Sequence, residues 1–339
     1  MDRGGFNGYD IIGDVHGCGA ELEALLDAMG YRSDADGLAH RHPSRQVIFV
    51  GDLIDRGPEQ LRVLAVVKSM VDAGTARMVL GNHEFNALAY HTEHPLAPGR
   101  FLRPHDDPDD ERSAKNEKQH SAFLKQVQGS ERSTYLGWMW IQPLWLDLGG
   151  LRVVHACWHQ PSIDLLTAEL GSSHLSTVEQ LRRASDPADP LYTAIETILK
   201  GPEISLTDHD QQAYLDKDKH KRTEARVRWW NSGATTLREL AEMDGKFTTA
   251  DGKDYPELPD LTVPGGASHS YDGQVPVVYG HYWRQGTPTR DQDWTDRTAC
   301  VDFSSVKGGR LTAYRWSGES RIEAGNYVSV GARASLRDS

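Results

Sequence analysis

Residues 9–84 repeat one local pattern three times: a short apolar strand, a glycine turn with charged or polar residues, and then a helical stretch. The predicted strands span residues 9–13, 46–50 and 77–80. Helical periodicity follows at 20–29 and again from Pro58 onward. Alternating strands and helices predict an α/β fold with a parallel or mixed sheet, in which the polar turns gather at the carboxyl ends of the strands. We therefore expect the catalytic or ligand-binding residues to lie in these turns.

The three turns carry side chains that bind metal ions or phosphate. In chain order they hold Asp14 and His16; Asp52, Asp55 and Arg56; and Asn82, His83 and Glu84. Asp14 and His16 are two residues apart, so an extended segment would place both on one face. Carboxylate and neutral imidazole are both ligands for divalent transition metals.

The other groups in the turns have complementary chemistry. Arg56 can grip a phosphate with two parallel hydrogen bonds. The amide of Asn82 can offer its oxygen to a metal and its nitrogen to phosphate, and His83 is a candidate acid–base group. Buried carboxylates at neighbouring strand ends repel one another unless cations neutralise them, so together the turns predict a two-metal site.

Two metals need more ligands, and two further histidines follow apolar runs in the same way. His155 ends the run at 151–154 and His281 ends the run at 277–280, which predicts both as ligands. Other histidines lie in polar stretches and are predicted to be solvated; these are His40, His42, His91, His94, His105 and His120.

The remaining chain predicts one domain over residues 1–325, with a tail at 326–339. Strands are expected at 144–148, 151–156, 275–280, 298–303 and 311–316, with Gly149 and Gly150 forming a hairpin turn. A loop-rich insertion is expected at about 91–135. A second insertion at about 160–270 combines helices at 177–184 and 191–199 with a long polar stretch. Both insertions are expected to cap the site.

Net charge and cysteine content indicate which partners and which cellular compartment to expect. The 339 residues carry a formal net charge of -12, which disfavours binding to long nucleic acids. Three widely spaced cysteines indicate a reducing compartment. No apolar stretch is long enough to span a membrane, and the N-terminus does not resemble a signal peptide. The prediction is a cytoplasmic protein without a membrane partner.

The motifs GDVHG, GDLIDRG and GNHE, followed by the histidines of VVHAC and VYGHYW, resemble the phosphoprotein phosphatase family of calcineurin-like metallophosphoesterases. The similarity is closest to bacterial branches: diadenosine tetraphosphatases, stand-alone phosphatases and the phosphatase domain of polynucleotide kinase-phosphatase. The C-terminal segment ACVDFSSVKGGRLTAYRW also resembles the strand pair that closes that fold. The resemblance implies a β-sandwich of two mixed sheets flanked by helices, with inserted cap segments.

The resemblance also implies a role for each motif residue. Asp14 and His16 would bind the first metal, Asp52 would bridge both, and Asn82, His155 and His281 would bind the second. His83 would be the general acid, oriented by Asp55, while Arg56 and Asn82 would bind phosphate. A second phosphate-binding arginine is expected at Arg226 or Arg228, although the spacing there departs from the family pattern.

The expected reaction is hydrolysis of a phosphate ester or phosphoanhydride by a metal-activated hydroxide. Two divalent ions are expected, with manganese preferred over iron, zinc or nickel. A small nucleotide or dinucleoside polyphosphate is favoured as the substrate. Trp229, Trp230, Tyr282 and Trp283 could stack a base, although a place in the buried core is the commoner fate of tryptophan. The alternatives are a phosphatase acting on Ser, Thr or Tyr of a phosphoprotein and a metal-bound binding module without catalysis. The filled acid position at His83 disfavours the binding module.

Overall fold

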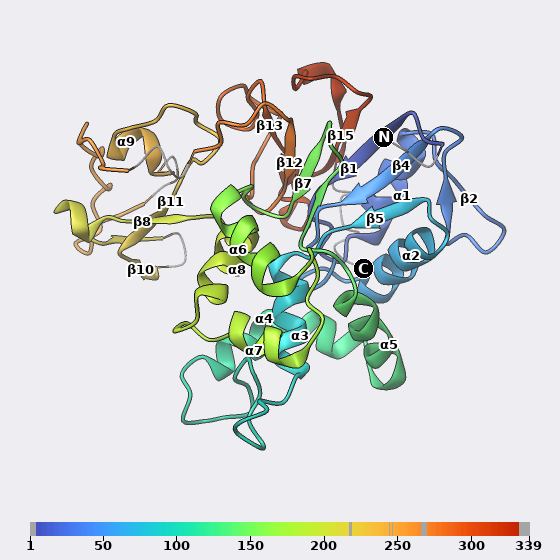
Figure 1. The fold of residues 1–339 in the computed structure, drawn as a ribbon, viewed down its shortest axis with the longest axis horizontal. Coiled ribbons are helices and arrows are strands. Elements are labelled where there is room, and N and C mark those ends of the chain that lie inside the picture. Colours follow the sequence, from blue (N-terminus) through green and yellow to red (C-terminus); the bar gives the residue numbers. More distant parts are fainter. Residues whose placement is uncertain (1–4, 217–218, 244, 246, 266–269, 332–339) are drawn as a thin grey trace, which may run out of the picture.

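Two mixed sheets form the centre of the structure, a computed structural model that describes residues 5–216, 219–243, 245, 247–265 and 270–331 (Figure 1). The larger sheet has the strand order β14–β15–β1–β4–β5, and β16 pairs with β15. Its strands are β1 (Gly8–Ile12), β4 (Arg45–Phe49), β5 (Ala76–Met78), β14 (Asp302–Phe303), β15 (Arg310–Trp316) and β16 (Tyr327–Gly331). The β1, β4 and β5 strands are parallel to one another, whereas β15 runs antiparallel to β1.

The smaller sheet has the order β13–β12–β7–β6. Its strands are β6 (Trp145–Asp147), β7 (Arg152–Val154), β12 (Val277–Tyr279) and β13 (Thr298–Cys300). The β6 and β7 strands form the antiparallel hairpin predicted around Gly149 and Gly150, while β12 is parallel to both β7 and β13. Parallel β7 and β12 point their carboxyl ends in one direction, which brings the residues after them together.

Alternate residues of the central strands face two different cores. In β4 and just after it, Ile48 and Val50 belong to a core shared with Val153 and Val278 of the smaller sheet. Their neighbours in the strand, including Phe49, belong to the core that contains the helices. This period of two is what a sheet covered on both faces requires. The predicted sandwich of two mixed sheets flanked by helices is confirmed.

Helices cover the outer faces of the sandwich. They include α1 (Gly19–Ala28), α2 (Gln60–Asp72), α3 (Asn82–His91), α6 (Gln160–Leu170), α7 (Val178–Ala184) and α8 (Pro190–Lys200). The start of α8 is specified locally, because the Asp189 side chain accepts the N–H of Leu191 and Pro190 occupies the first turn. The α2 helix begins at Gln60, two residues after the predicted start. Within the part of the chain that the structure describes, no helix has the length and apolar character needed to cross a membrane.

The first insertion is irregular over residues 92–112, as predicted, but the prediction of a loop-rich segment is wrong for the rest, which is helical. It contains α4 (Ser113–Gln126) and most of α5 (Gly129–Trp140). The buried residues of α4 are Ser113, Asn116, His120 and Phe123, spaced three or four apart along one face. Three of these four side chains are polar, and for this reason apolar periodicity did not reveal the helix.

The second insertion divides into two parts. Its first part supplies α6, α7 and α8, whose apolar residues join the main core. Its second part, residues 203–263, is called the lobe here and projects to the left in Figure 1. The lobe elements are β8 (Glu203–Ser205), η1 (Thr207–His209), β9 (Tyr214–Leu215), β10 (Lys221–Arg222), β11 (Glu224–Arg226) and α9 (Leu237–Leu240). The β8–β11 and β9–β10 pairs enclose a separate small core that includes Ile204, Leu206 and Leu240.

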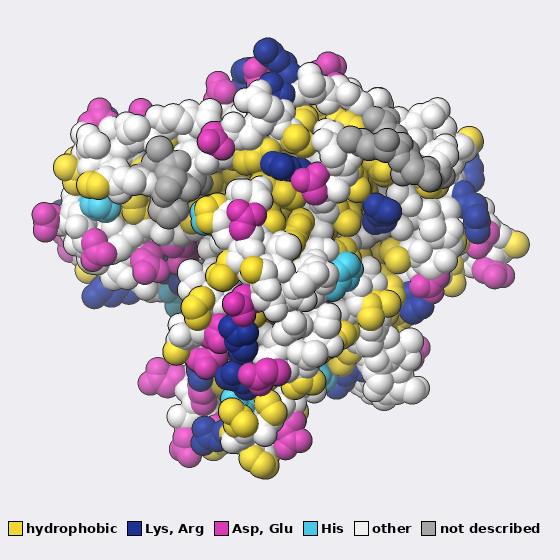
Figure 2. Space-filling view, in the orientation of Figure 1, with side chains coloured by type: hydrophobic (Ala, Val, Ile, Leu, Met, Phe, Trp, Pro, Cys, Tyr) yellow, Lys and Arg dark blue, Asp and Glu magenta, His cyan; other side chains and the backbone are white. Residues whose placement is uncertain are grey.

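Acidic and basic side chains lie close together over α7 and its surroundings, below the centre of Figure 2. Arg182 pairs there with Glu179, and Arg183 pairs with Glu169 and Asp189. The acidic and basic side chains of this surface therefore offset one another in charge.

The prediction of a C-terminal tail at 326–339 is wrong for residues 327–331, which form β16 and pair with β15. Residues 332–339 lie outside the described part of the chain. The remaining short elements are β2 (Arg32–Ser33), which pairs with β3 (His40–Arg41), and the 3-10 turns η3 (Ser305–Lys307) and η4 (Ala324–Asn326).

Candidate metal centre

Five turns meet where parallel strands end. The larger sheet contributes the turns after β1, β4 and β5, and the smaller sheet contributes the turns after β7 and β12. Each turn delivers a predicted site residue within a few positions of the last strand residue. The position of the site therefore follows directly from strand direction, as expected for an α/β sheet.

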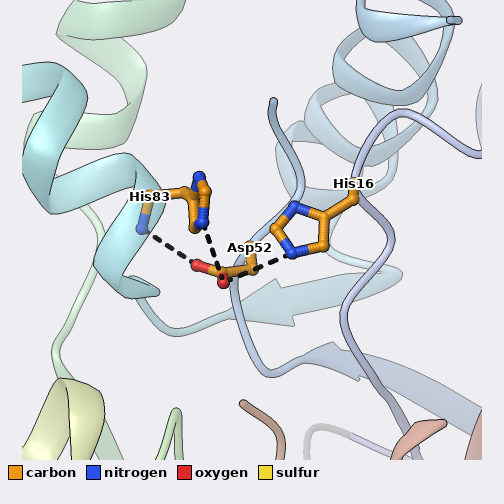
Figure 3. Close-up of side chains that lie close together, drawn as sticks. All are labelled: His16, Asp52 and His83. Carbon is orange, nitrogen blue, oxygen red and sulfur yellow. Dashed lines mark hydrogen bonds and ion pairs between the residues drawn. The ribbon is translucent and has the colours of Figure 1, made fainter. Parts of the chain in front are cut away.

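Asp52 lies at the middle of this group. Its Oδ2 atom is 3.6 Å from Nε2 of His16, 3.5 Å from Nε2 of His155 and 3.9 Å from Nε2 of His83. Figure 3 shows His16 and His83 converging on this carboxylate, with the backbone N–H of His83 also donating to Oδ1 at 2.9 Å. Ligand atoms of two triads, His16–Asp52–His83 and Asp52–His155–His281, lie within 4.8 Å of one another. Asp52 belongs to both triads.

The imidazoles are oriented by backbone carbonyls. The Nδ1 atom of His16 lies 2.7 Å from the carbonyl of Ile54, and Nδ1 of His155 lies 2.8 Å from the carbonyl of Val50. These contacts leave both Nε2 atoms facing the centre, which is how metal-binding histidines are usually held. Burial, together with the neighbouring His83, lowers the pKa of His16 to about 3, so its ring is in the neutral form that binds metal.

Other buried groups also fit divalent cations. The Nε2 atoms of His16 and His281 are buried and have no hydrogen-bond partner among the described residues. Burial and the nearby carboxylates of Asp302 and Asp52 raise the pKa of Asp14 well above its usual value. Orphaned imidazole nitrogens beside crowded carboxylates are the pattern that a bound cation resolves. The residues present therefore fit the divalent ions that this class of site uses.

The backbone at the site departs from the extended geometry expected for Asp14 and His16. The β1 strand already ends at Ile12, and His16 has a left-handed φ of 43°. Left-handed φ values recur in the other turns, at Asp52 (49°), Asp55 (70°), Arg56 (68°), His281 (74°) and Trp283 (52°). Such conformations are costly for residues other than glycine and tend to cluster at functional sites. Gly81 is needed nearby, because a Cβ there would collide with Asp52.

Glu84 holds the second and third turns together. Its carboxylate accepts the backbone N–H groups of Asp52 and Leu53 at 2.8 Å and that of Gly81 at 3.0 Å. The sequence placed Glu84 at the third turn but assigned it no role. Because it fixes the backbone of the central carboxylate, Glu84 is a positioning residue for the centre.

His83 forms a buried chain with Asp55 and His120. Its Nδ1 atom lies 2.5 Å from Oδ2 of Asp55, and Nδ1 of His120 lies 2.8 Å from the same oxygen, close in distance although not aligned as a hydrogen bond. Burial alone would raise the pKa of Asp55, but His120 and His83 outweigh it and lower the pKa well below its usual value. Arg56 reaches the other side of the ring, with Nη2 at 3.4 Å from Nε2 of His83.

The prediction that the polar-stretch histidines are solvated is wrong for His120 and His40, which are both buried. His42, His91, His94 and His105 are only partly exposed. His120 comes from α4 of the first insertion, and its spacing from Asn116 and Phe123 was the one signal in the sequence that it faces inward.

The two candidate arginines point to different places. Arg226 lies with Cζ 5.5 Å from the ring centroid of Tyr282, and its charge adds to burial in lowering the pKa of His281. Arg228 instead donates to the carbonyl oxygens of Arg238 and Glu239 within the lobe, at 3.0 and 3.4 Å. Only Arg226 approaches the centre.

The structure thus brings together the predicted groups of all five turns. Asp14 also joins them, because its carboxylate accepts the N–H of His281 at 3.2 Å. Asn82 places its Oδ1 atom 3.1 Å from Nε2 of His155. Sequence reasoning missed Asp302, a buried acid at the start of β14, whose Oδ2 atom accepts the N–H of Trp283 at 2.7 Å.

Comparisons with known proteins agree with this architecture. The sequence model of the calcineurin-like phosphoesterases matches residues 9–281. The chain is 34% identical over 96% of its length to a bis(5'-nucleosyl)-tetraphosphatase PrpE [asymmetrical] from Oceanobacillus iheyensis, covering 92% of that protein. It is 26% identical over 90% of its length to a symmetrical bis(5'-nucleosyl)-tetraphosphatase from Psychromonas ingrahamii, also covering 92%.

A solved structure of a protein serine/threonine phosphatase from Saccharomyces cerevisiae covers 99% of this chain and 83% of its own. Its identity is 12% and the TM-score is 0.47, too low to bear on function. The family match spans most of the chain, and relatives along its whole length are hydrolases. The chain belongs to the calcineurin-like phosphoesterases and is a metallophosphoesterase that hydrolyses phosphoric ester bonds.

Proposed function

We propose that the chain hydrolyses a phosphoanhydride bond of a small nucleotide, with a dinucleoside polyphosphate as the preferred substrate class. The observation that carries this proposal is the similarity to two bis(5'-nucleosyl)-tetraphosphatases over at least 90% of this chain and 92% of theirs. Similarity over the full length includes the insertions, where substrate recognition resides in folds of this kind.

The proposed roles follow from the geometry of the centre. Asp14, His16, Asp52, Asn82, His155 and His281 would hold two divalent ions, manganese first, with iron, zinc or nickel as alternatives. When bound, such ions neutralise phosphoryl charge and activate water for attack. The triads also place His83 beside Asp52, so its assignment as an acid rather than a ligand is part of the proposal.

The remaining steps belong to the protein's own side chains. Arg56 is exposed beside His83 and can bind the phosphoryl oxygens with two parallel hydrogen bonds. His83 would give its proton from Nε2 to the departing oxygen, because its Nδ1 atom is occupied by Asp55. His120 would keep Asp55 in place, and Arg226 would add a second positive charge from the lobe.

We also propose an extent for the catalytic domain, a cellular location and a class of partner. Residues up to 331 would form one catalytic domain, since β16 completes the larger sheet beyond the predicted boundary at 325. A cytoplasmic location is supported by three buried cysteines that form no disulfide. The proposed partner is a phosphorylated small molecule rather than a long nucleic acid or a phosphoprotein.

The test is a turnover screen of the manganese-loaded protein. Diadenosine tetraphosphate, mononucleotides and phosphopeptides would be compared by kcat/KM at one free manganese concentration. We expect the dinucleoside polyphosphate to exceed the phosphopeptides by at least about a hundredfold, a difference of about 2.7 kcal/mol in transition-state binding. Equal or greater efficiency on phosphopeptides would assign the protein to protein dephosphorylation.

A further inference from the structure

Trp283 differs from the other aromatic residues near the centre. Trp229, Trp230 and Tyr282 are buried, so they cannot serve as the base-stacking surface that the sequence suggested. Trp283 is partly exposed and lies two residues after His281. It is therefore the member of this set that a substrate can touch.

The protein holds Trp283 in an unfavourable conformation. Its φ is 52°, in the left-handed region that bulky residues rarely occupy. The buried carboxylate of Asp302 accepts its N–H at 2.7 Å, and the indole stacks on the His16 imidazole at 5.6 Å between centroids and 20° between planes. A strained backbone secured by a buried carboxylate indicates that the direction of this side chain matters.

Two cations converge on the same indole. The Cζ atom of Arg56 lies 4.4 Å from the ring centroid, and Nζ of Lys307 lies 4.0 Å from it. Arg56 also contacts the ring of His83, so Trp283 connects Lys307 to the side chains of the metal centre. Both positive charges lie against one indole ring, and an anion bound beside that ring would be attracted by both.

We propose that Lys307 and Trp283, together with Arg56, form a subsite for the phosphoryl group next to the one being attacked. The chain would thereby select phosphoanhydride chains over single phosphate esters. This inference rests on the proposed function and names the residues that would give it its selectivity. Because an imidazole and two cations already lie against the indole, the ligand class is a polyphosphate rather than a nucleobase.

The experiment measures inhibition of p-nitrophenyl phosphate turnover by phosphate and by tripolyphosphate, with free manganese buffered. In the unaltered protein, tripolyphosphate should bind more tightly than phosphate. Lys307→Met should raise the Ki of tripolyphosphate about tenfold more than the Ki of phosphate, the effect of losing one charge-assisted contact. Lys307→Arg should retain most of the preference.

Lys253→Met is the matched control, because it removes the same charge from an exposed position in the lobe, where Lys253 pairs with Asp251. It should leave the ratio of the two Ki values unchanged. Equal shifts for both inhibitors in Lys307→Met, or no shift in either, would overturn the subsite. So would a Trp283→Leu variant that loses affinity for adenosine but not for tripolyphosphate.

This measurement does not depend on cleavage of any dinucleotide. If the unaltered protein fails to hydrolyse diadenosine tetraphosphate but prefers tripolyphosphate through Lys307, the proposed substrate is wrong and the subsite stands. If it hydrolyses diadenosine tetraphosphate and Lys307→Met has no selective effect, the substrate class stands and the subsite is wrong.

Discussion

The metal centre and the lobe are built in opposite ways. The centre is held by contacts between residues far apart in the chain: Glu84 binds the N–H of Asp52, and Asp14 binds the N–H of His281. The lobe is held mostly by neighbours, through the short β8–β11 and β9–β10 pairs and a small core of its own. The geometry of the centre therefore depends on the whole sandwich, whereas much of the lobe depends on contacts within the lobe.

Buried aromatic rings and polar contacts join the two regions, and Trp229 and Trp230 of the lobe belong to the main core. The N–H of Val227 donates to the carbonyl of Pro202 at 2.9 Å, and the buried Arg284 of the loop after β12 pairs with Glu242 of the lobe at 2.5 Å. Arg226 lies beside this junction, against Tyr282. A lobe attached in this way can present one or two side chains to the substrate while many of its other residues pack on one another. The difference predicts that substitutions at the centre abolish activity and that substitutions in the lobe adjust it.

The largest effect is expected for Asp52→Asn. One carboxylate is shared by both triads, so its loss should lower the metal content to below about one ion per chain and slow turnover by about three decades or more. Elemental analysis of the purified variant measures this directly. Asp251→Asn, an exposed acid of the lobe, is the control and should keep full metal content. Two tightly held ions in Asp52→Asn would refute the bridging role.

His83→Ala should fail in a different way. Removing the proposed acid should slow hydrolysis of phenyl phosphate by about two to four decades while metal content stays near normal. The loss should be smaller for p-nitrophenyl phosphate, whose leaving group needs less protonation. A variant that is empty of metal would instead make His83 a ligand, as its place in the first triad allows.

The way in which each residue reaches the centre explains which site residues the sequence could predict. His155 and His281 were identifiable because each follows an apolar strand within two residues, and parallel strands deliver such residues to one edge. The alternation of strands and helices predicted a parallel or mixed α/β sheet, whereas the sandwich of two sheets was implied by the family resemblance. His120 was missed, because it reaches Asp55 from a helix whose buried face is mostly polar and only its helical spacing indicated that it faces inward. Lys307 and Trp283 meet only through tertiary packing, which local sequence patterns do not encode.

His120→Ala tests a contact that links the first insertion to the centre. We expect phenyl phosphate turnover to fall about tenfold to a hundredfold, the range for residues that orient a functional group. Without His120, Asp55 should hold the proposed acid His83 less well. The fall should therefore be smaller for p-nitrophenyl phosphate, whose leaving group needs less protonation. His120→Asn, which keeps an N–H donor, should recover part of the loss, and exposed His220→Ala in the lobe should change nothing. Equal losses on both substrates would mean that His120 only supports the fold.

The smallest effect is expected at the lobe, where Arg226 and Arg228 form a matched pair two residues apart. Arg226 lies against Tyr282 and adds to burial in lowering the pKa of His281, whereas Arg228 donates to carbonyl oxygens of α9. Arg226→Ala should therefore lower kcat/KM for diadenosine tetraphosphate about tenfold, by removing one charge-assisted contact to phosphate, with little change in thermal stability. Arg228→Ala should leave kcat/KM within about twofold and lower the stability of the lobe by about 1–2 kcal/mol, which urea unfolding would detect. Reversal of this pattern, with activity following Arg228, would show that the lobe acts on the substrate through a residue that the structure turns away from the centre.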